Sequence, residues 1–203
     1  MENQKILGTA PIGKLLIQYS TPAIISMLVN AAYNFIDRVF IGHIPGVGNL
    51  AIAGVGISLP IMTVLMAFSV LIAAGAATNM SLRLGEGKIK EAEVLIGNAI
   101  TLAIITGVAL TIVYVLFADR ILEAFGASDA SLQYAKEYMN MLVIGIIPWM
   151  LAMTLNFTMR ADGSPKRAAI IMISSAVIKV PLDAFFIYTL EMGVAGAALA
   201  TSI

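Results

Sequence analysis

Apolar residues fill most of this chain in long runs, and polar residues gather in the short segments between them. Five runs reach or exceed the ~20 residues that a helix needs to cross the hydrocarbon core of a bilayer. They cover residues 15–41, 50–82, 92–117, 134–159 and 168–190. Glycine-rich turns separate several of these runs, and none of the turns is long enough to hold a domain. The pattern predicts an all-α, polytopic membrane protein built as one helical bundle.

A sixth apolar run begins at Gly193 and continues to Ile203. At 1.5 Å per residue it rises only about 16 Å, which is too short to cross the membrane. We therefore expect a six-helix bundle whose last helix is incomplete, with residues 1–203 forming the N-terminal transmembrane bundle of a longer protein. A natural half-protein is the alternative.

The composition narrows the function classes. Hydrophobic residues make up 60% of the chain and charged residues 12%, and the mean hydropathy is +0.94. A soluble domain could not keep so much apolar surface away from water. The chain has no Cys and a single His, His43, and it lacks the common sequence signatures of zinc peptidases and serine hydrolases. We expect a protein that is not an enzyme, with no cofactor, no metal site and no nucleic-acid partner.

Basic residues in the short loops predict the orientation. Eight of the twelve Lys and Arg residues fall on one side, in the N-terminal tail, the 83–93 loop and the 160–167 loop. The opposite side holds only Arg120 and Lys136. Because loops rich in Lys and Arg stay in the cytoplasm, we expect a multi-pass protein of the cytoplasmic membrane, in contact with membrane lipid, with a cytoplasmic N-terminus.

Two carboxylates lie inside predicted spans, Asp37 in the first and Asp183 in the fifth. Both helices run outward, which places each carboxylate about 6–10 Å from the outer end of its helix. Thr201, in the inward-running sixth helix, falls about 12 Å down in the same layer. An ionisable residue at such a depth marks a functional site, because its charge is costly in hydrocarbon unless it faces a cavity or carries a proton or cation.

Each carboxylate also belongs to a polar stripe on its helix. The first stripe has spacings of 4, 4 and 3, and the second has spacings of 4, so each lies on one helix face. The stripes consist of Ser26, Asn30, Asn34 and Asp37, and of Ser175, Lys179 and Asp183. Polar faces in lipid turn toward the bundle interior, which predicts that Asn30 and Asn34 line a cavity beside the carboxylates.

The stripes have a functional and a structural interpretation. In the functional one, desolvation favours the neutral form of a carboxyl group, so Asp37 or Asp183 takes up a proton from outside and releases it inside. The membrane potential then supplies about 2.3 kcal/mol per charge per 100 mV, enough to help drive a cationic solute outward. In the structural one, Lys179 and Asp183 form a self-neutralising ion pair and Asp37 pairs with Arg38.

Two residues of the fourth span are candidates for substrate contacts. Trp149 follows Pro148 near the middle of the span, deeper than the interfacial belt where Trp usually lies. Its ring could bind an organic cation through a cation–π contact, or it could simply pack. Met153 lies one turn further on, and flexible thioethers suit a cavity that accepts many ligands. Most of the methionines, however, we expect to be core or lipid-facing.

Four segments together resemble the multidrug and toxic compound extrusion (MATE) transporters over essentially the whole chain. They are Tyr33-Asn34-Phe35-Ile36-Asp37-Arg38-Val39-Phe40-Ile41-Gly42, Ala53-Gly54-Val55-Gly56, Arg160-Ala161-Asp162-Gly163-Ser164-Pro165-Lys166 and Met192-Gly193-Val194-Ala195-Gly196-Ala197-Ala198-Leu199-Ala200-Thr201. The resemblance implies a twelve-helix transporter of two six-helix bundles that alternate access around a central cavity, of which this chain is similar to the first.

The resemblance also implies roles for individual residues. Asp37, Asp183 and Thr201 match cation-responsive positions of the first bundle, and Pro22 matches a proline at which the first helix is proposed to bend. Lys179 departs from the family pattern, which usually has Asn four residues before this Asp. Because sodium needs oxygen ligands where this ammonium would lie, we expect proton coupling rather than sodium coupling.

These observations predict a cation-coupled, most simply proton-coupled, antiporter that exports drugs or other small organic solutes, which we expect to be cationic. Its partners would be those solutes, membrane lipid and a missing C-terminal six-helix half. The alternatives are a lipid-precursor flippase with a similar bundle and an inert or structural half-protein that transports nothing.

Overall fold

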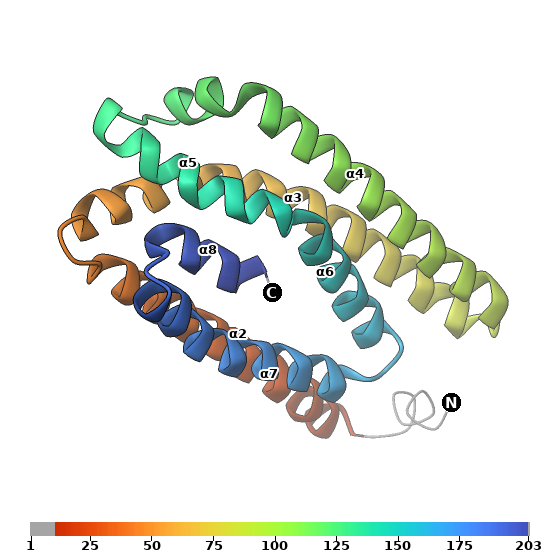
Figure 1. Cartoon of the computed structure of the whole chain (residues 1–203). Helices are drawn as coiled ribbons and strands as arrows, with labels where there is room; N and C mark the ends of the chain where they lie inside the picture. Colours follow the sequence, from red (N-terminus) through yellow and green to blue (C-terminus); the bar gives the residue numbers. More distant parts are fainter. Residues whose placement is uncertain (1–10, 203) are drawn as a thin grey trace.

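The computed structural model describes residues 11–202, which form a bundle of α-helices (Figure 1). Lys5, one of the basic residues of the N-terminal tail, and Ile203 lie outside the described residues. The helices are α2 (Ile12–Gly42), α3 (Gly48–Gly85), α4 (Ile89–Ala124), α5 (Asp129–Ile144), α6 (Ile146–Ala161), α7 (Pro165–Ala184), a π-helical turn η1 (Phe185–Thr189) and α8 (Gly193–Ser202). No strand occurs among the described residues, so the all-α prediction is confirmed.

Four helical segments are long and apolar enough to cross a membrane: Leu15–Gly42, Gly48–Gly85, Ile89–Ala124 and Pro165–Thr189. Their outward surface stays apolar, with Leu71 70% exposed and Leu116 69% exposed, as expected for side chains that face lipid. The short α8 begins after a tight turn in which Glu191 and Gly193 both adopt positive φ angles, of 53° and 55°. The chain is a multi-pass membrane protein.

The fourth predicted span, 134–159, is not one helix. It is the pair α5 and α6, bent by 55° at Gly145. A Cβ at Gly145 would lie 2.5 Å from the Ser202 side chain of α8, so the break lies where α8 approaches closely. Pro148 falls in the first turn of α6, where a missing N–H costs no helical hydrogen bond. Counted as one broken span, the pair brings the crossings to five.

The helices form two groups that α8 connects. In one group α2 and α7 lie side by side, and in the other α3 packs against α4, α5 and α6 (Figure 1). α8 packs chiefly against α5 and η1. Much of the buried apolar core belongs to the second group, with Leu122, Met139 and Met150 fully or almost fully enclosed. The polar residues of α2 and α7 therefore meet at the junction of the two helices rather than in this core.

A contact between Tyr188 and Phe40 attaches α2 to η1, the turn that follows α7. The Tyr188 hydroxyl of η1 donates a 2.9 Å hydrogen bond to the Phe40 carbonyl of α2. The two rings pack edge to face, with centroids 6.0 Å apart and planes at 87°. This contact lies close in sequence to Asp37 on one helix and to Asp183 on the other, so it helps to fix the spacing between the two carboxylates.

The turn between α3 and α4 holds a cluster of exposed charges. Glu86 pairs with Arg83 at 3.0 Å and with Lys88 at 2.9 Å, and Arg83 also reaches Glu91 at 3.3 Å. The bonds from Lys88 and Arg83 hold the pKa of the Glu86 carboxyl below its usual range. Such exposed pairs contribute little to stability. Arg83 and Lys88 are among the basic loop residues from which the orientation is predicted.

Candidate functional site

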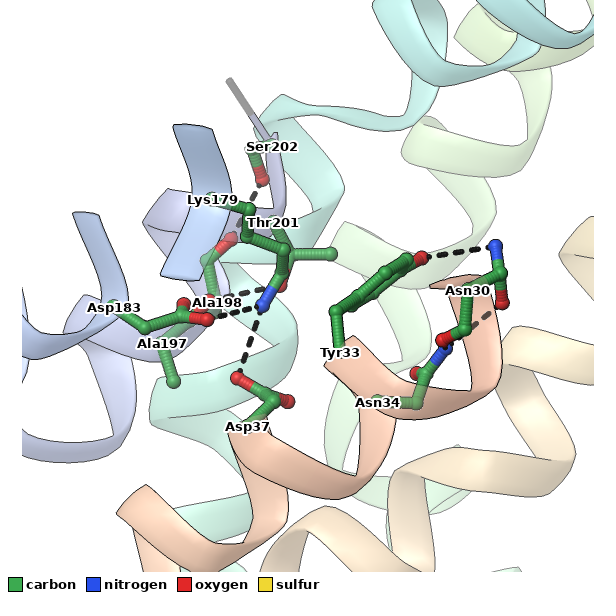
Figure 2. Close-up of polar contacts among 10 residues, drawn as sticks. All are labelled: Asn30, Tyr33, Asn34, Asp37, Lys179, Asp183, Ala197, Ala198, Thr201 and Ser202. Carbon is green, nitrogen blue, oxygen red and sulfur yellow. Dashed lines mark hydrogen bonds and ion pairs between the residues drawn. The ribbon is translucent and has the colours of Figure 1, made fainter. Parts of the chain in front are cut away.

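Three ionisable side chains meet between α2 and α7, and we call them the Asp37–Lys179–Asp183 triad (Figure 2). The Lys179 ammonium donates to Asp183 Oδ2 at 2.7 Å and to Asp37 Oδ1 at 3.1 Å. Lys179 and Asp183 occupy positions i and i+4 of α7 and so share a helix face, whereas Asp37 comes from the last turns of α2. The ammonium therefore bridges two carboxylates from different helices.

The triad is almost completely removed from solvent. Asp183 is 0% exposed, Asp37 is 7% exposed and Lys179 is 8% exposed. Asp183 Oδ1 is buried and has no hydrogen-bond partner among the described residues. A buried carboxylate oxygen without a partner is energetically costly. Asp37 keeps the greater residual exposure of the two carboxylates and the longer bond to the ammonium.

Two tyrosines complete the surroundings of the triad. The Lys179 ammonium lies 5.4 Å from the centre of the Tyr33 ring, within the range of a cation–π contact. Tyr138 of α5 is 3% exposed and interacts electrostatically with the carboxylates of Asp37 and Asp183. The sequence reasoning did not single out either tyrosine. Tyr33 could have been noticed one turn before Asp37, but no local signal pointed to Tyr138 on a distant helix.

The net charge of the triad follows from its composition. Two carboxylates and one ammonium carry −1 when all three are ionised, and zero when one carboxyl holds a proton. A buried net charge is strongly unfavourable in a low-dielectric environment. The arrangement can therefore hold one proton at low cost and give it up when another positive charge arrives.

Both interpretations of the polar stripes can be compared with this geometry. The ion pair between Lys179 and Asp183 is present. Asp37, however, pairs with Lys179 of α7, while Arg38 is exposed and forms no ion pair among the described residues. The expected pairing of Asp37 with Arg38 is therefore wrong. Arg38 points to a different side of the helix, since neighbouring residues lie about 100° apart.

The asparagines of the α2 stripe form a small network of their own. Asn34 Nδ2 donates to Asn30 Oδ1 at 3.0 Å and to the Asn30 carbonyl at 2.8 Å. Asn30 Nδ2 donates to the Tyr33 hydroxyl at 3.2 Å, which links the network to the ring beside Lys179 (Figure 2). Asn34 is exposed and Asn30 is half-buried. These amides are therefore linked to the triad through Tyr33.

Pro22 lies inside α2, where the Ser26 hydroxyl donates to its carbonyl at 2.7 Å. Thr201 of α8 donates to the Ala197 carbonyl at 2.8 Å, a bond within its own helix. Ser202, which the sequence reasoning missed, donates both to Ala198 at 2.9 Å and to the Met141 carbonyl of α5 at 3.3 Å. The side chain that hydrogen-bonds from α8 to another helix is thus that of Ser202 and not that of Thr201.

Trp149 and Met153 are half-buried residues of α6. Trp149 packs against the apolar core, and α6 packs mainly on α3 and α4. The structure does not bring either residue to the triad. Of the residues predicted for the site, Asp37, Lys179 and Asp183 come together, and Asn30 and Asn34 join them through Tyr33.

A groove of about 560 Å³ lies elsewhere, between the end of α4 and α5. It begins where Phe117 interrupts α4 with non-helical angles (φ −124°, ψ 18°). Its charged residues are exposed, and Asp119 pairs with Lys136 across it. Because exposed pairs are screened by solvent, we take the buried triad and not this groove as the candidate site.

Comparison with known proteins places this geometry in a family. The MatE family model matches residues 22–185, a range that contains the whole triad. The chain is 27% identical to the FAD transporter of Shewanella oneidensis over 99% of its own length and 45% of that protein. It is 30% identical to the multidrug export protein MepA of Staphylococcus haemolyticus over 95% of its length and 42% of that protein. The chain thus spans less than half the length of the curated relatives it matches.

Solved structures agree with the sequence match. The MATE multidrug transporter DinF-BH superposes with a TM-score of 0.88 at 36% identity, covering 96% of this chain and 43% of that one. A MATE transporter in its bent conformation gives 0.88 at 28% identity, covering 100% and 44%. Because the family model covers most of the sequence and the fold is shared, the chain belongs to the MATE family of membrane transporters.

Proposed function

We propose that this chain is the N-terminal bundle of an antiporter that exports small organic cations from the cytoplasm in exchange for protons. The single observation that carries the proposal is the buried triad, with the Lys179 ammonium at 2.7 Å and 3.1 Å from two carboxylates. Membership of the MATE family and the names of the relatives, multidrug export proteins among them, support the transport of drug-like solutes.

In the proposed cycle the triad alternates between two charge states. A proton from the outside binds Asp37, the carboxylate with the greater residual exposure, and neutralises the triad. When the site opens inward, an organic cation replaces the proton, which enters the cytoplasm. Exchange of one state for the other needs no net charge to remain buried, and this keeps the barrier for reorienting the bundle low.

The proton is the coupling ion in this proposal because of the place that Lys179 occupies. Sodium is held by several oxygen ligands at short range, and here an ammonium fills the space between the two carboxylates. Its positive charge would also repel a second fixed cation. A proton, in contrast, needs only one carboxylate oxygen. The proposal therefore assigns coupling to Asp37, Asp183 and Lys179, and gives Thr201 no more than a supporting part through its place on α8.

The positions of the other predicted residues indicate whether they would contact the solute or allow α2 to bend. Asn30 and Asn34 supply amide groups at the wall next to the triad, where they would contact the solute. Trp149 and Met153 belong to α6 and would contact a solute only on the far side of the cavity. Pro22 interrupts the hydrogen bonds of α2 and would absorb bending of this helix when the charge near its other end changes.

The remaining parts of the proposal concern the assembly. We infer a second six-helix bundle, because the chain covers 42–45% of the curated relatives it matches. The protein would lie in the cytoplasmic membrane, with its N-terminus in the cytoplasm according to the loop charges. The flippase and inert half-protein alternatives are less favoured, since the named relatives are exporters and an FAD transporter.

The test uses the full-length protein that contains this chain, expressed in everted membrane vesicles. A proton gradient that is acidic inside should drive uptake of ethidium, and an uncoupler should abolish it. A sodium gradient alone should not drive uptake. Expression of residues 1–203 alone should give no uptake. Uptake that survives the uncoupler, or that follows sodium instead, would overturn proton coupling.

A further inference from the structure

We infer that Lys179 makes the site selective for solutes with a single positive charge, because it limits the triad to one exchangeable proton. The inference deepens the proposed function and rests on it, since it names the charge class of the exported cation. It is carried by one geometric fact: the ammonium lies between the two carboxylates and bonds to both, within a site that is almost fully buried.

The charge that the site can balance depends on Lys179. Without it, two buried carboxylates would need two protons to become neutral, and the doubly ionised site could balance a dication. With Lys179 in place, one proton already gives neutrality. A second proton would leave a buried ammonium facing two neutral acids, at net +1. A dication bound to the fully ionised triad would also leave net +1. Both states leave a buried charge without compensation.

The surrounding groups do not change this count. Tyr33 on α2 and Tyr138 on α5 face the triad as neutral side chains. Arg38, another charged residue near it, is exposed, lies about 100° around α2 from Asp37 and forms no ion pair among the described residues. On α8 the nearest polar candidates, Thr201 and Ser202, are uncharged and bond to backbone carbonyls. Among the described residues, Lys179 is therefore the one cation that pairs directly with the two carboxylates.

The exchange balances in both atoms and charge. One proton leaves the Asp37 carboxyl as one monovalent organic cation binds, and no bond other than the O–H bond is broken. Because one positive charge replaces another, export of a monovalent cation is electroneutral. It should therefore respond to the pH gradient and not to the membrane potential, which differs from the contribution of the potential expected from the sequence alone.

The experiment measures protons released when a cation binds to the purified full-length protein. Calorimetric titrations in two buffers of different ionisation enthalpy give the number of protons per cation, with tetraphenylphosphonium as the monocation and methyl viologen as the dication. For the wild type we expect one proton released per tetraphenylphosphonium, and weak methyl viologen binding that releases no second proton. For Lys179→Gln we expect methyl viologen binding with release of two protons.

Two further variants make the result decisive. The double variant Asp37→Asn, Lys179→Gln keeps one carboxylate and no ammonium, so its net charge is again −1 and it should return to one proton and to monocation preference. Lys136→Gln removes the lysine that pairs with Asp119 in the groove between α4 and α5, and this variant should give the same proton count as wild type. A role of Lys179 in packing alone would not move the proton count. If Lys179→Gln fails to fold, the double variant is compared with Asp37→Asn instead: Asp37→Asn, with Lys179 present, should release no proton, and the double variant should release one.

Two outcomes overturn the inference. One is release of two protons on methyl viologen binding to the wild type. The other is a dication count that does not change in Lys179→Gln. Failure of the proposed function looks different: the binding counts would follow the expectation while vesicles showed no proton-driven uptake of tetraphenylphosphonium.

Discussion

Lys179 and Asp37 are 142 positions apart in the chain, yet the Lys179 ammonium donates to Asp37 Oδ1 at 3.1 Å inside the bundle. This bond turns a local i,i+4 pair on α7 into a site shared between two helices. Breaking a buried pair by removal of one partner leaves a charge without compensation. Changes at any member of the triad should therefore alter both the charge balance and the contact between α2 and α7.

Neutralising either carboxylate should abolish energy-coupled efflux. In Asp37→Asn or Asp183→Asn the remaining carboxylate and Lys179 form a neutral pair that no longer needs a proton. We expect both full-length variants to insert normally and to lose efflux of ethidium driven by a pH gradient. Asp119→Asn is the matched control, since it removes a carboxylate that is also paired with a lysine but is exposed. Wild-type efflux in both triad variants would place coupling elsewhere, for instance in the second half.

Replacing Lys179 by Asn should change the ion dependence of efflux. The substitution removes the ammonium that stabilises the ionised carboxylates, so the site should keep its proton to higher pH. It also frees the space that sodium needs for oxygen ligands. We expect the efflux profile of the full-length variant to move toward alkaline pH or to become sensitive to sodium. Profiles in pH and in sodium that coincide with those of wild type would reduce Lys179 to a structural residue.

Two glycines in the same motif should respond oppositely to Ala. A Cβ at Gly54 would lie 2.8 Å from the Ala135 nitrogen and from the Tyr134 Cβ of α5, whereas a Cβ at Gly56 meets nothing within 4 Å. Gly54→Ala should lower stability by about 1–3 kcal/mol through overpacking. Gly56→Ala should be neutral or raise stability by about 0.5–1 kcal/mol, as for an open helical position. Thermal unfolding in detergent measures both, and equal stabilities would contradict the close packing of α3 on α5.

Single cysteines test the orientation, because the chain has no Cys of its own. The four loop glycines are poor positions for a cysteine. Three of them have positive φ angles, and a Cβ at the fourth would clash with the Gly42 carbonyl; they are Gly87, Gly126, Gly163 and Gly48. Exposed residues near these glycines are better labelling sites. Asn49→Cys and Ala130→Cys should react with an impermeant thiol reagent added to intact cells. Lys90→Cys and Asp162→Cys should react only after the membrane is opened. The reverse pattern would invert the predicted topology.

Much of the fold could be predicted because a membrane span depends on local properties. Length and apolar content locate a span within a few residues, and the stripe from Ser26 to Asp37 follows from helical periodicity alone. The break at Gly145 was missed, although Gly145 and Pro148 lie three residues apart and together indicate it. The interruption at Phe117 and the π-helical turn at Phe185–Thr189 have no comparable local signal.

The site could be predicted only in part, for a physical reason. Spacing along a helix showed that Lys179 and Asp183 share a face, but not which helix that face would meet. The partner of Asp37 depends on the packing of α2 against α7, which is set by the whole bundle. Local proximity suggested Arg38 instead. The burial of Asp183 Oδ1 likewise depends on the neighbouring helices and becomes visible only once they are in place.

The contact between Tyr188 and Phe40 has a mechanical consequence. It joins a phenol hydroxyl to a backbone carbonyl, both of which are uncharged. Protonation or deprotonation of the carboxylates therefore leaves this hydrogen bond in place. In the proposed cycle, protonation of Asp37 weakens its bond to Lys179, while the contact between Tyr188 and Phe40 keeps the C-terminal end of α2 attached to η1. A change of charge at the triad would then move α2 and α7 together, with the contact between Tyr188 and Phe40 holding the two helices at one end.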